Sequence, residues 1–461
     1  MKKQHIILII LGTIYILLSA FHSNLWFDET YSTAIANHSF IDIFTIGASD
    51  VHPILYYYCL KILNVFFGPN IIIYRLFSCF CISMLGILGY THIRKITNDK
   101  VGLLFTFFAF FLPIMPIYAT EVRMYSLGII FVTLTAYYAY KIIKNNTNKD
   151  YILFVLFSIL SAYTHNYGLV STGIINLYLF IYILKNKLPI KRYIYTIIAQ
   201  VIIYLPWFII LVKQTLTVSK GFWITFDFPK DFISLLQFQF TGLNSIVGLL
   251  ICLGIYTLMF IKCKKSSIAR TSLFIYLTVL IVMSLVSLIS PIIVPRYMFI
   301  PTGLLIFSLA YFISLYNKYI VTGVCSVILL IGISVNINNI KINYDKSNTE
   351  YITYINNNLL KTDTILYTDI INSASILSKV NHKQYFYNID NWNIKDPYKA
   401  YLPTLEVIDN ITNIKGRIWI IDNYDKKLFN LLKNEVNIIE HKEFKTKYHN
   451  LYYNIYLVER R

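Results

Sequence analysis

Long apolar runs separated by short polar segments fill the first 340 residues of the chain. Most of the runs approach the length of about 20 residues that a helix needs to cross the hydrocarbon core of a bilayer. Eleven segments are predicted as membrane spans, at residues 5–25, 71–92, 101–117, 124–143, 151–164, 166–184, 192–212, 245–262, 271–290, 297–316 and 319–338. The pattern therefore predicts a mainly α-helical, polytopic membrane bundle.

The segment 53–67 leaves two span counts open, because its length of about 15 residues is short for a crossing. If it does not cross, the basic segments all share one side of the membrane: Lys2 and Lys3, 92–100, 141–149, 185–192 and 262–270. If it crosses, the later basic segments fall opposite Lys2 and Lys3. The first count obeys the positive-inside rule. We therefore expect 53–67 to lie in, or dip into, the outer leaflet, with a cytoplasmic N-terminus and an exterior C-terminus at the plasma membrane.

The composition changes after Asn339. Residues 341–461 hold 31 charged side chains, 17 basic and 14 acidic, and contain no cysteine and no apolar run of span length. Strand-like stretches at 364–369, 384–389, 417–422 and 454–460 alternate with helix-like segments, which is typical of a small α/β domain. The predicted organisation is a transmembrane domain at 1–340, with a first exterior loop at 26–70, followed by an exterior α/β domain at 341–461.

Composition supports the membrane class and excludes others. Of the 461 residues, 56% are hydrophobic and 14% are charged, against about 25% charged in ordinary soluble domains, and the mean hydropathy is +0.57. The net charge of +18 is split into short clusters between spans, so no nucleic acid partner is expected. The six cysteines have no metal-ligand spacing and imply no disulfide framework. The first run, 5–21, lacks a clear cleavage site and is expected to stay as an anchor.

Carboxylates are rare and one-sided in the predicted bundle. Residues 1–340 contain nine, of which Asp99 and Asp150 lie in basic segments. The other seven fall on the predicted exterior: Asp28, Glu29, Asp42, Asp50, Glu121, Asp227 and Asp231. Asp28 and Glu29 stand where a helix would leave the membrane, a depth at which acids are costly and usually functional. The alternative is that they only favour the start of a helix at the interface.

Short exterior connections carry further polar side chains. The segment 118–126 brings Glu121, Arg123 and Tyr125, the segment 163–168 brings His165, and the segment 290–297 brings Arg296 and Tyr297. An arginine at the end of a span is often only an interfacial anchor, and a lone histidine at a helix end is often structural.

A carboxylate centre with several cations at a membrane surface suits sugar transfer from a lipid phosphate to an acceptor hydroxyl. The phosphate leaves without being protonated, so one carboxylate suffices as the general base for the acceptor. Arginine holds a developing phosphate charge through paired donors. Nearby carboxylates would also stabilise an oxocarbenium-like sugar.

Several motifs resemble the C-type integral-membrane glycosyltransferases that use polyprenyl-phosphate sugars, in particular the superfamily of protein O-mannosyltransferases and lipid A aminoarabinose transferases. The resembling stretches are FDETYS at 27–32, D-x-HP-x-LYY at 50–57, YATEVRMYSL at 118–127, YLPW at 204–207 and PRY at 295–297. Their order and spacing cover the chain from the first span to about residue 300. Each motif is weak alone, and the tail after 340 resembles only the general plan of an exterior cap.

The resemblance implies roles for individual residues. Asp28 corresponds to the catalytic aspartate and acts as the general base, Glu29 is similar to the second acid, and Glu121 completes the acidic centre. The lipid phosphate and substrate would be bound by His52, Arg123, Tyr125, His165, Arg296 and Tyr297. Many relatives have HPP where this chain has His52-Pro53-Ile54, and the aminoarabinose enzyme has lysine in place of His52. No cofactor is evident; a divalent metal would have Asp28 and Glu29 as ligands.

The expected function is therefore an inverting hexosyl- or pentosyltransferase acting on the exterior face, with a polyprenyl-phosphate sugar as donor and a glycan, lipid or protein as acceptor. One alternative is a transporter or flippase of lipid-linked glycans, which would place ionisable residues along a path inside the bilayer. A second is a glycan polymerase or ligase with its active centre in a large later loop, here 213–244.

Overall fold

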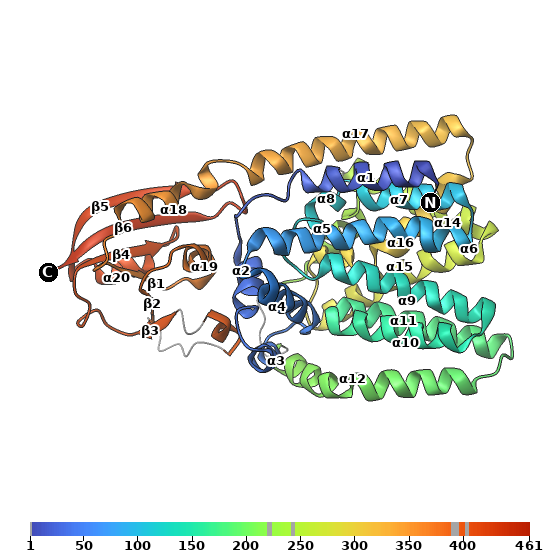
Figure 1. Cartoon of the computed structure of the whole chain (residues 1–461), viewed down its shortest axis with the longest axis horizontal. Helices are drawn as coiled ribbons and strands as arrows, with labels where there is room; N and C mark the ends of the chain where they lie inside the picture. The colour runs from blue at the N-terminus through green and yellow to red at the C-terminus, as the bar shows by residue number, and fades with distance from the viewer. Residues whose placement is uncertain (1, 219–223, 241–244, 389–395, 402–404) are drawn as a thin grey trace. The chain divides into compact units, whose positions relative to one another are not determined.

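The computed structural model of the chain describes all residues except 1, 219–223, 241–244, 389–395 and 402–404. It divides into two compact units. The first, named here the helical unit, comprises Met1–Ala20, Val51–Tyr56 and Ile73–Ile337. The second, named the sheet unit, comprises Phe21–Asp50, Tyr57–Ile72 and Asn338–Arg461. The segments of the predicted first loop therefore pack mainly with the C-terminal part of the chain, and Figure 1 gives the labels used below.

The helical unit is built almost entirely from α-helices joined by short connections (Figure 1). Its α-helices are α1 (Lys3–Leu17), α5 (Ile71–Leu88), α6 (Arg94–Ile96), α7 (Asp99–Phe111), α8 (Met115–Tyr118), α9 (Tyr125–Asn145), α10 (Asn148–Thr164), α11 (Asn166–Lys185), α12 (Lys191–Val218), α13 (Lys230–Gln237), α14 (Ile246–Lys262), α15 (Ser267–Ile289), α16 (Thr302–Ser314) and α17 (Lys318–Asn343), the last of which continues into the sheet unit. Three short segments have other helical geometries: η1 (Gly89–Ile93) is a π-helix, and η2 (Cys263–Lys265) and η3 (Pro295–Phe299) are 3₁₀-helices.

Each of the eleven predicted spans coincides with a helix. Among the described residues, seven helices are long and apolar enough to cross a membrane. These are Ile71–Ile96, Tyr125–Asn145, Asn166–Lys185, Lys191–Leu216, Ile246–Lys265, Ser267–Ile289 and Lys318–Asn358. The other four predicted spans form the shorter helices α1, α7, α10 and α16. The chain is a multi-pass membrane protein, and the count of eleven crossings stays a prediction.

Two glycines let the backbones of η1 and α7 approach each other closely. A Cβ atom added to Gly102 would lie 2.6 Å from the carbonyl oxygen of Gly89, and one added to Gly89 would lie 2.6 Å from the carbonyl oxygen of Gly102. Because backbone atoms stand on both sides, neither clash could be relieved by turning a side chain. Small residues of this kind are the usual means by which membrane helices gain close packing.

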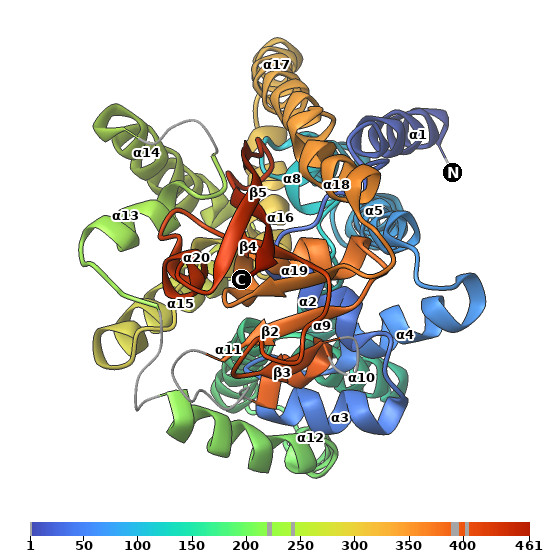
Figure 2. The ribbon, with the colours of Figure 1, turned by 90° about the vertical axis from the view of Figure 1, so that its left-hand side faces the viewer.

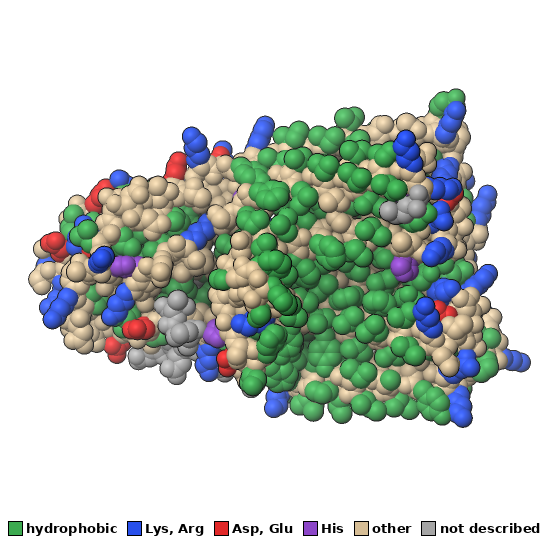
Figure 3. All heavy atoms as spheres, in the orientation of Figure 1, with side chains coloured by type: hydrophobic (Ala, Val, Ile, Leu, Met, Phe, Trp, Pro, Cys, Tyr) green, Lys and Arg blue, Asp and Glu red, His purple; other side chains and the backbone are tan. Residues whose placement is uncertain are grey.

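The basic segments meet at one end of the helical unit. Lys2 forms an ion pair with Asp99, and Lys100 donates to the carbonyl oxygens of Ser314 and Tyr316, both at 2.7 Å. Figure 3 shows Lys and Arg side chains gathered at the end of this unit that carries the N-terminus, while hydrophobic side chains cover its visible flank. We call this the lysine-rich end. The positive-inside rule requires the basic segments to lie on one side of the membrane, and they lie at one end of this unit. The assignment of this end to the cytoplasm stays a prediction.

The sheet unit contains a six-stranded mixed sheet with strand order β3-β2-β1-β4-β6-β5 (Figure 2). Strands β1, β2, β3 and β4 are parallel, whereas β6 runs antiparallel to both β4 and β5. The strands are β1 (Thr364–Tyr367), β2 (Gln384–Tyr387), β3 (Glu406–Ile408), β4 (Arg417–Asp422), β5 (Val436–Lys445) and β6 (Tyr452–Arg460). The helices of this unit are α2 (Phe27–Ile35), α3 (Phe40–Ser49), α4 (Leu55–Phe67, whose first two residues belong to the helical unit), α18 (Ser347–Asn358), α19 (Ile370–Lys379) and α20 (Lys427–Leu432), with the 3₁₀ segment η4 (Asp396–Tyr401).

All four strands predicted from the sequence are present as β1, β2, β4 and β6. Residue 389, the last of the second predicted strand, lies outside the described residues. The fold class of a mainly helical membrane protein with a small C-terminal sheet domain is therefore confirmed. The exterior location of that domain and its boundary at residue 341 stay predictions.

A buried carboxylate holds the start of β4. Asp363, only 2% exposed, accepts hydrogen bonds from Arg417 Nε at 3.1 Å and Nη2 at 2.7 Å, and from Trp419 Nε1 at 2.8 Å. Burial acts to raise the pKa of Asp363, but the hydrogen bonds from Arg417, the amide of Leu360 and Trp419 outweigh it and hold the pKa below its usual value. This network ties β4 to the residue that precedes β1.

The ambiguous segment 53–67 forms the helix α4, which has 13 residues and ends at Gly68 with a left-handed φ of +73°. Its last turn exposes Val65, Phe66 and Phe67, at 63%, 75% and 61% of their surface. Three exposed apolar side chains at one helix end suit contact with lipid. The place of α4 in the outer leaflet stays a prediction.

Candidate functional site

The acid pair Asp28 and Glu29 lies in the first turn of α2, which belongs to the sheet unit. Acidic side chains favour this position because of the partial positive charge of a helix N-terminus. Their environments differ, since Glu29 is fully buried and Asp28 is half-buried. The preference of acids for a helix start does not require a buried carboxylate. This preference alone therefore does not explain why Glu29 is buried.

The buried carboxylate of Glu29 is bound by the turn between β5 and β6. The hydroxyl of Tyr448 donates to Glu29 Oε2 at 2.7 Å. The next residue, His449, stacks on Trp26 with ring centroids 4.4 Å apart and planes 9° from parallel. His449 and Asn450 both have left-handed backbones, with φ of 56° and 51°, which reverses the chain tightly. The C-terminal part of the chain therefore contributes directly to the surroundings of the acid pair.

A neighbouring helix fixes this turn. The amide of Tyr448 donates to Asn348 Oδ1 at 2.8 Å, and the amide of Lys447 donates to Ser347 Oγ at 3.2 Å. Both partners stand at the start of α18. The Tyr448 side chain thus extends from a backbone that is held at two points.

The other two acids of the predicted loop have different surroundings. Asp42 lies in the first turn of α3, where Ser39 Oγ donates to its carboxylate at 2.7 Å and accepts from its amide at 3.1 Å. This is a helix cap, and it explains Asp42 without catalysis. Asp50 ends α3, and Tyr57 Oη stands 3.5 Å from its Oδ2.

The helical unit holds a second group of predicted site residues. The rings of His52 and His165 have centroids 5.4 Å apart, and Tyr297 lies 4.7 Å from His165 and 6.1 Å from His52. All three residues are at most 9% exposed. Sequence positions 52, 165 and 297 are thus brought into one cluster, as the prediction of a shared site requires.

Arg296 supplies the positive charge of this cluster. It lies in η3, whose first residue is Pro295, a residue preorganised for the start of a helical turn. Its Nε donates to the hydroxyl of the fully buried Tyr125 at 3.0 Å, and its guanidinium carbon is 5.7 Å from the ring centroid of Tyr297. We call the set His52, Tyr125, His165, Arg296 and Tyr297 the cation cluster.

The tautomer of His165 follows from its hydrogen bonding. His165 caps α11, and its Nδ1 accepts from the amide of Tyr167 at 3.0 Å. The proton of the neutral ring is therefore on Nε2. That Nε2 is buried and has no hydrogen-bond partner among the described residues. A buried donor without an acceptor is costly in a folded protein and suits a site whose ligand supplies the acceptor.

Glu121 and Arg123 lie between α8 and α9, in a segment held by its backbone. Ser78 Oγ donates to the carbonyl oxygen of Glu121 at 2.7 Å, and Arg75 Nη1 donates to that of Thr120 at 2.6 Å. Arg123 is 3% exposed and Arg75 only 1%. Arg75 was not among the predicted residues, although an arginine five residues into the apolar helix α5 was a usable signal.

The predicted residues thus form groups in both units. Asp28 and Glu29 belong to the sheet unit, whereas the cation cluster, Glu121 and Arg123 belong to the helical unit. The chain passes between the two units at five places, one of which, between residues 50 and 51, is next to His52 in the sequence. Within the described part of the chain, no group of three or more His, Cys, Asp and Glu side chains could hold a metal ion. The predicted metal ligands Asp28 and Glu29 are therefore not joined by a third, and metal dependence stays untested.

Comparisons with known proteins give a relationship of fold. No family model matches the chain, and no curated protein sequence matches it. A crystal structure of ArnT from Cupriavidus metallidurans in the apo state has a TM-score of 0.62 at 10% sequence identity, covering 98% of this chain and 97% of that chain. A crystal structure of the same ArnT bound to undecaprenyl phosphate has a TM-score of 0.65 at 10% identity, with the same coverage. Over nearly its whole length, this chain therefore has the fold of ArnT, a C-type membrane glycosyltransferase, as its sequence motifs indicated.

Proposed function

We propose that this protein is a membrane glycosyltransferase that moves a sugar from a polyprenyl-phosphate donor to an acceptor hydroxyl. The observation that carries the proposal is the buried Nε2–H of His165, which has no acceptor among the described residues and lies in the same cluster as Arg296. A hydrogen-bond donor and a guanidinium together suit a phosphate. An ArnT structure of the same fold is bound to undecaprenyl phosphate, which supports a lipid phosphate as the anion.

The proposed chemistry is one inverting displacement. The acceptor oxygen attacks the anomeric carbon from the face opposite the phosphate, and the bond from that carbon to the phosphate oxygen breaks with its electrons leaving on the phosphate. Asp28 takes the acceptor proton as the general base. Arg296, His165 and His52 hold the phosphate as its charge grows, an interaction that strengthens in the transition state.

Glu29 and Glu121 have supporting roles in this proposal. Glu29 is buried and bonded to Tyr448, so it is suited to fix the start of α2 and to orient substrate rather than to exchange protons. Glu121 completes the acidic centre, and Arg123 adds to the phosphate site. The acceptor side would face the exterior, with the N-terminus in the cytoplasm and the sheet domain outside. The sugar, whether hexose or pentose, and the acceptor, whether glycan, lipid or protein, are left open by this chemistry.

The test uses the full-length protein in lipid nanodiscs with radiolabelled polyprenyl-phosphate sugars and a panel of acceptors. Asp28→Asn should abolish transfer and the release of free polyprenyl phosphate, because an amide cannot accept the proton. Asp42→Asn is the matched control, since it makes the same change in the same loop at a helix cap and should retain transfer. An Asp28→Asn protein with normal folding and full activity would refute the assignment.

The same experiment separates the alternatives. A flippase of lipid-linked glycans would move the donor across vesicle membranes without releasing polyprenyl phosphate. A polymerase or ligase centred in the loop 213–244 would lose activity on substitution of that loop and keep it in Asp28→Asn; residues 219–223 and 241–244 of this loop lie outside the described residues. The anomeric configuration of the product, measured by NMR, tests inversion.

A further inference from the structure

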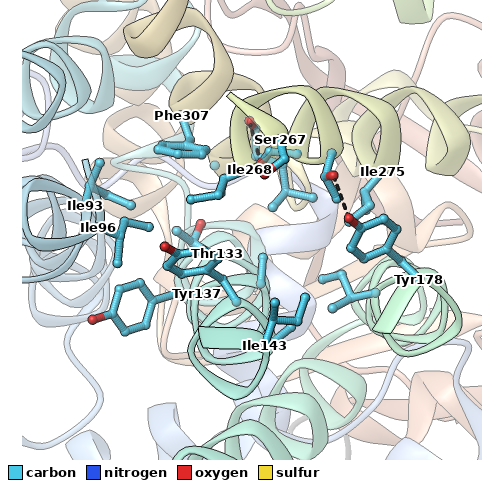
Figure 4. Close-up of a pocket in the computed structure, with 18 of the residues that line it drawn as sticks. Ile93, Ile96, Thr133, Tyr137, Ile143, Tyr178, Ser267, Ile268, Ile275 and Phe307 are labelled. Atoms are coloured by element: carbon cyan, nitrogen blue, oxygen red, sulfur yellow. Dashed lines mark hydrogen bonds between the residues drawn. The ribbon is translucent and has the colours of Figure 1, made fainter. Parts of the chain in front are cut away.

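A separate, partly open cavity lies between helices of the helical unit. It is lined by α9, α11, α15 and α16, together with the segment around α6 (Figure 4). Ile93, Ile143, Ile275 and Phe307 give it apolar walls. None of the residues assigned above to the acid pair or the cation cluster lines it.

The walls are mainly apolar, although Tyr137, Tyr140, Tyr182 and Ser267 also bring hydroxyl groups to the lining. Three of the lining hydroxyls already donate within the protein. Thr133 Oγ1 donates to the carbonyl of Ile129 at 2.6 Å, and Thr271 Oγ1 to the hydroxyl of Tyr178 at 2.9 Å, the bond dashed at Tyr178 in Figure 4. Ser272 Oγ contacts the carbonyl of Leu304 at 3.2 Å. Because aliphatic side chains and aromatic rings form most of the lining, this cavity is suited to an apolar occupant.

The cavity reaches the lysine-rich end of the helical unit. Its lining includes Ile143, near the C-terminus of α9, Tyr182, in the last turn of α11, and Ser267, the first residue of α15. At its other end it reaches Thr133 on α9. Ten residues of α-helix separate Thr133 from Ile143, so the cavity extends about 15 Å along α9.

Cations lie close in the chain to the lining residues at this end of the cavity. The lining residues near the helix ends are followed or preceded closely in the chain by Lys95, Lys141, Lys144, Lys185, Lys264, Lys265 and Arg270. The two acids of these segments have other partners: Asp99 pairs with Lys2 and Arg94, and Asp150 accepts from Thr147 Oγ1 at 2.7 Å. The segments at this end of the cavity therefore carry a net positive charge.

We propose that this cavity is a binding site for an anionic glycerophospholipid of the leaflet at the lysine-rich end. One acyl chain fills the apolar cavity, and the phosphate lies among the lysines of its mouth. Basic pockets between membrane helices are a recurring recognition site for anionic lipid head groups. The membrane itself supplies such a lipid at this depth.

The donor's phosphate belongs elsewhere. Tyr125, which is bonded to Arg296, begins α9, and Ile143 lies 18 residues further along the same helix. This separation is about 27 Å, so the two ends of α9 carry two distinct anion environments. The lipid site stands on the cavity and its charges, and does not depend on the proposed transferase activity.

The test is native mass spectrometry of the delipidated full-length protein in detergent, titrated with dioleoyl phosphatidylglycerol or dioleoyl phosphatidylcholine. We expect phosphatidylglycerol to bind with a dissociation constant roughly tenfold lower than that of phosphatidylcholine. Ala136→Phe, which fills the cavity, should remove one bound lipid. The matched control is Gly173→Phe, which adds the same ring at a position on α11 where a Cβ meets nothing within 4 Å, and it should bind as the wild type does.

The head-group site is tested separately. Lys141→Gln with Lys144→Gln should reduce the preference for phosphatidylglycerol to about twofold or less, whereas Lys318→Gln, at the same end on α17, should leave it unchanged. Equal binding of the two lipids by the wild type, or full retention of the tight lipid by a folded Ala136→Phe protein, would overturn the proposal. Should Ala136→Phe fail to fold, the lysine variants and the wild-type comparison decide it, because neither alters the cavity.

Discussion

The bond between Tyr448 and Glu29 offers a sharp test of whether the C-terminal domain takes part in catalysis. Tyr448→Phe removes one hydroxyl and keeps the ring that packs against His22, whose centroid lies 5.3 Å away. The bond that is lost is 2.7 Å long and ends on a carboxylate that is 0% exposed. A hydrogen bond to a charged group contributes about 1.5–3 kcal/mol, and 1.36 kcal/mol corresponds to a tenfold rate change.

We therefore expect kcat of Tyr448→Phe to fall by about 10- to 100-fold, if the bond holds α2 in the geometry that Asp28 needs. The KM for the donor should stay within about twofold, because the phosphate is assigned to Arg296 and His165 in the helical unit. The assay is steady-state transfer in nanodiscs over a range of donor concentrations, with circular dichroism to check folding.

Tyr452→Phe is the matched control. Tyr452 also donates to a glutamate, Glu443, at 2.5 Å, and it begins β6, the strand after the same turn. Glu443 is 45% exposed, so losing this bond should change activity little. Wild-type kinetics in Tyr448→Phe, or equal losses in the two variants, would refute a role of the β5–β6 turn in supporting the acid pair.

Three further predictions concern other sites. Asp363→Asn should destabilise the sheet unit by about 3 kcal/mol, because it leaves Arg417 without its ionised partner. The pKa of Asp363 is depressed in the folded protein. The stability difference between wild type and variant should therefore be complete above about pH 5 and should vanish as the pH falls through that folded pKa. His165→Phe should raise the donor KM by about tenfold, because it removes a donor to the phosphate. Gly102→Ala should lower the thermal unfolding temperature by several degrees, because the added methyl meets the carbonyl oxygen of Gly89 at 2.6 Å.

Each of these has a contradicting result. If the unfolding temperature of Asp363→Asn is lower than that of the wild type by the same amount at about pH 3 as at about pH 7, the ionised carboxylate does not cause the stability difference. His165→Phe with an unchanged donor KM, measured by the transfer assay, would mean that its Nε2 only fills space. For Gly102, Gly173→Ala is the control, because a Cβ there meets nothing within 4 Å; equal effects of the two alanines would argue against close backbone packing.

Local patterns allowed much of the fold to be predicted. Apolar run length located eleven helices of the chain, because a helix that crosses a bilayer needs a run of about 20 mostly apolar residues. Strands β1, β2 and β4 were visible because their residues are buried and rich in β-branched and aromatic types. Strand β5 was missed, since its last six residues include Glu440, Lys442, Glu443 and Lys445, charges that suggest a loop but also protect an exposed sheet edge.

Local sequence patterns also indicated part of the candidate site. Clustered rare acids and short connections indicated Asp28, Glu29, His165 and Arg296, because ionisable groups are costly near the membrane and stand out in the sequence. Tyr448 could not be found in this way, since the chain has 39 tyrosines and nothing local distinguishes this one. Its role depends on a contact between residues 419 positions apart.

That separation also affects the order in which the protein is made. Translation proceeds at roughly 5–20 residues per second, so Glu29 is synthesised about 20 to 80 s before Tyr448. During this interval α2 exists without α19, η4 or the β5–β6 turn, all of which pack on it or bond to it in the finished unit. A chain that stops before residue 448 would carry the helices of the helical unit but would lack the hydrogen bond from Tyr448 to Glu29. The surroundings of the buried Glu29 therefore depend on a segment that is synthesised after the whole helical unit.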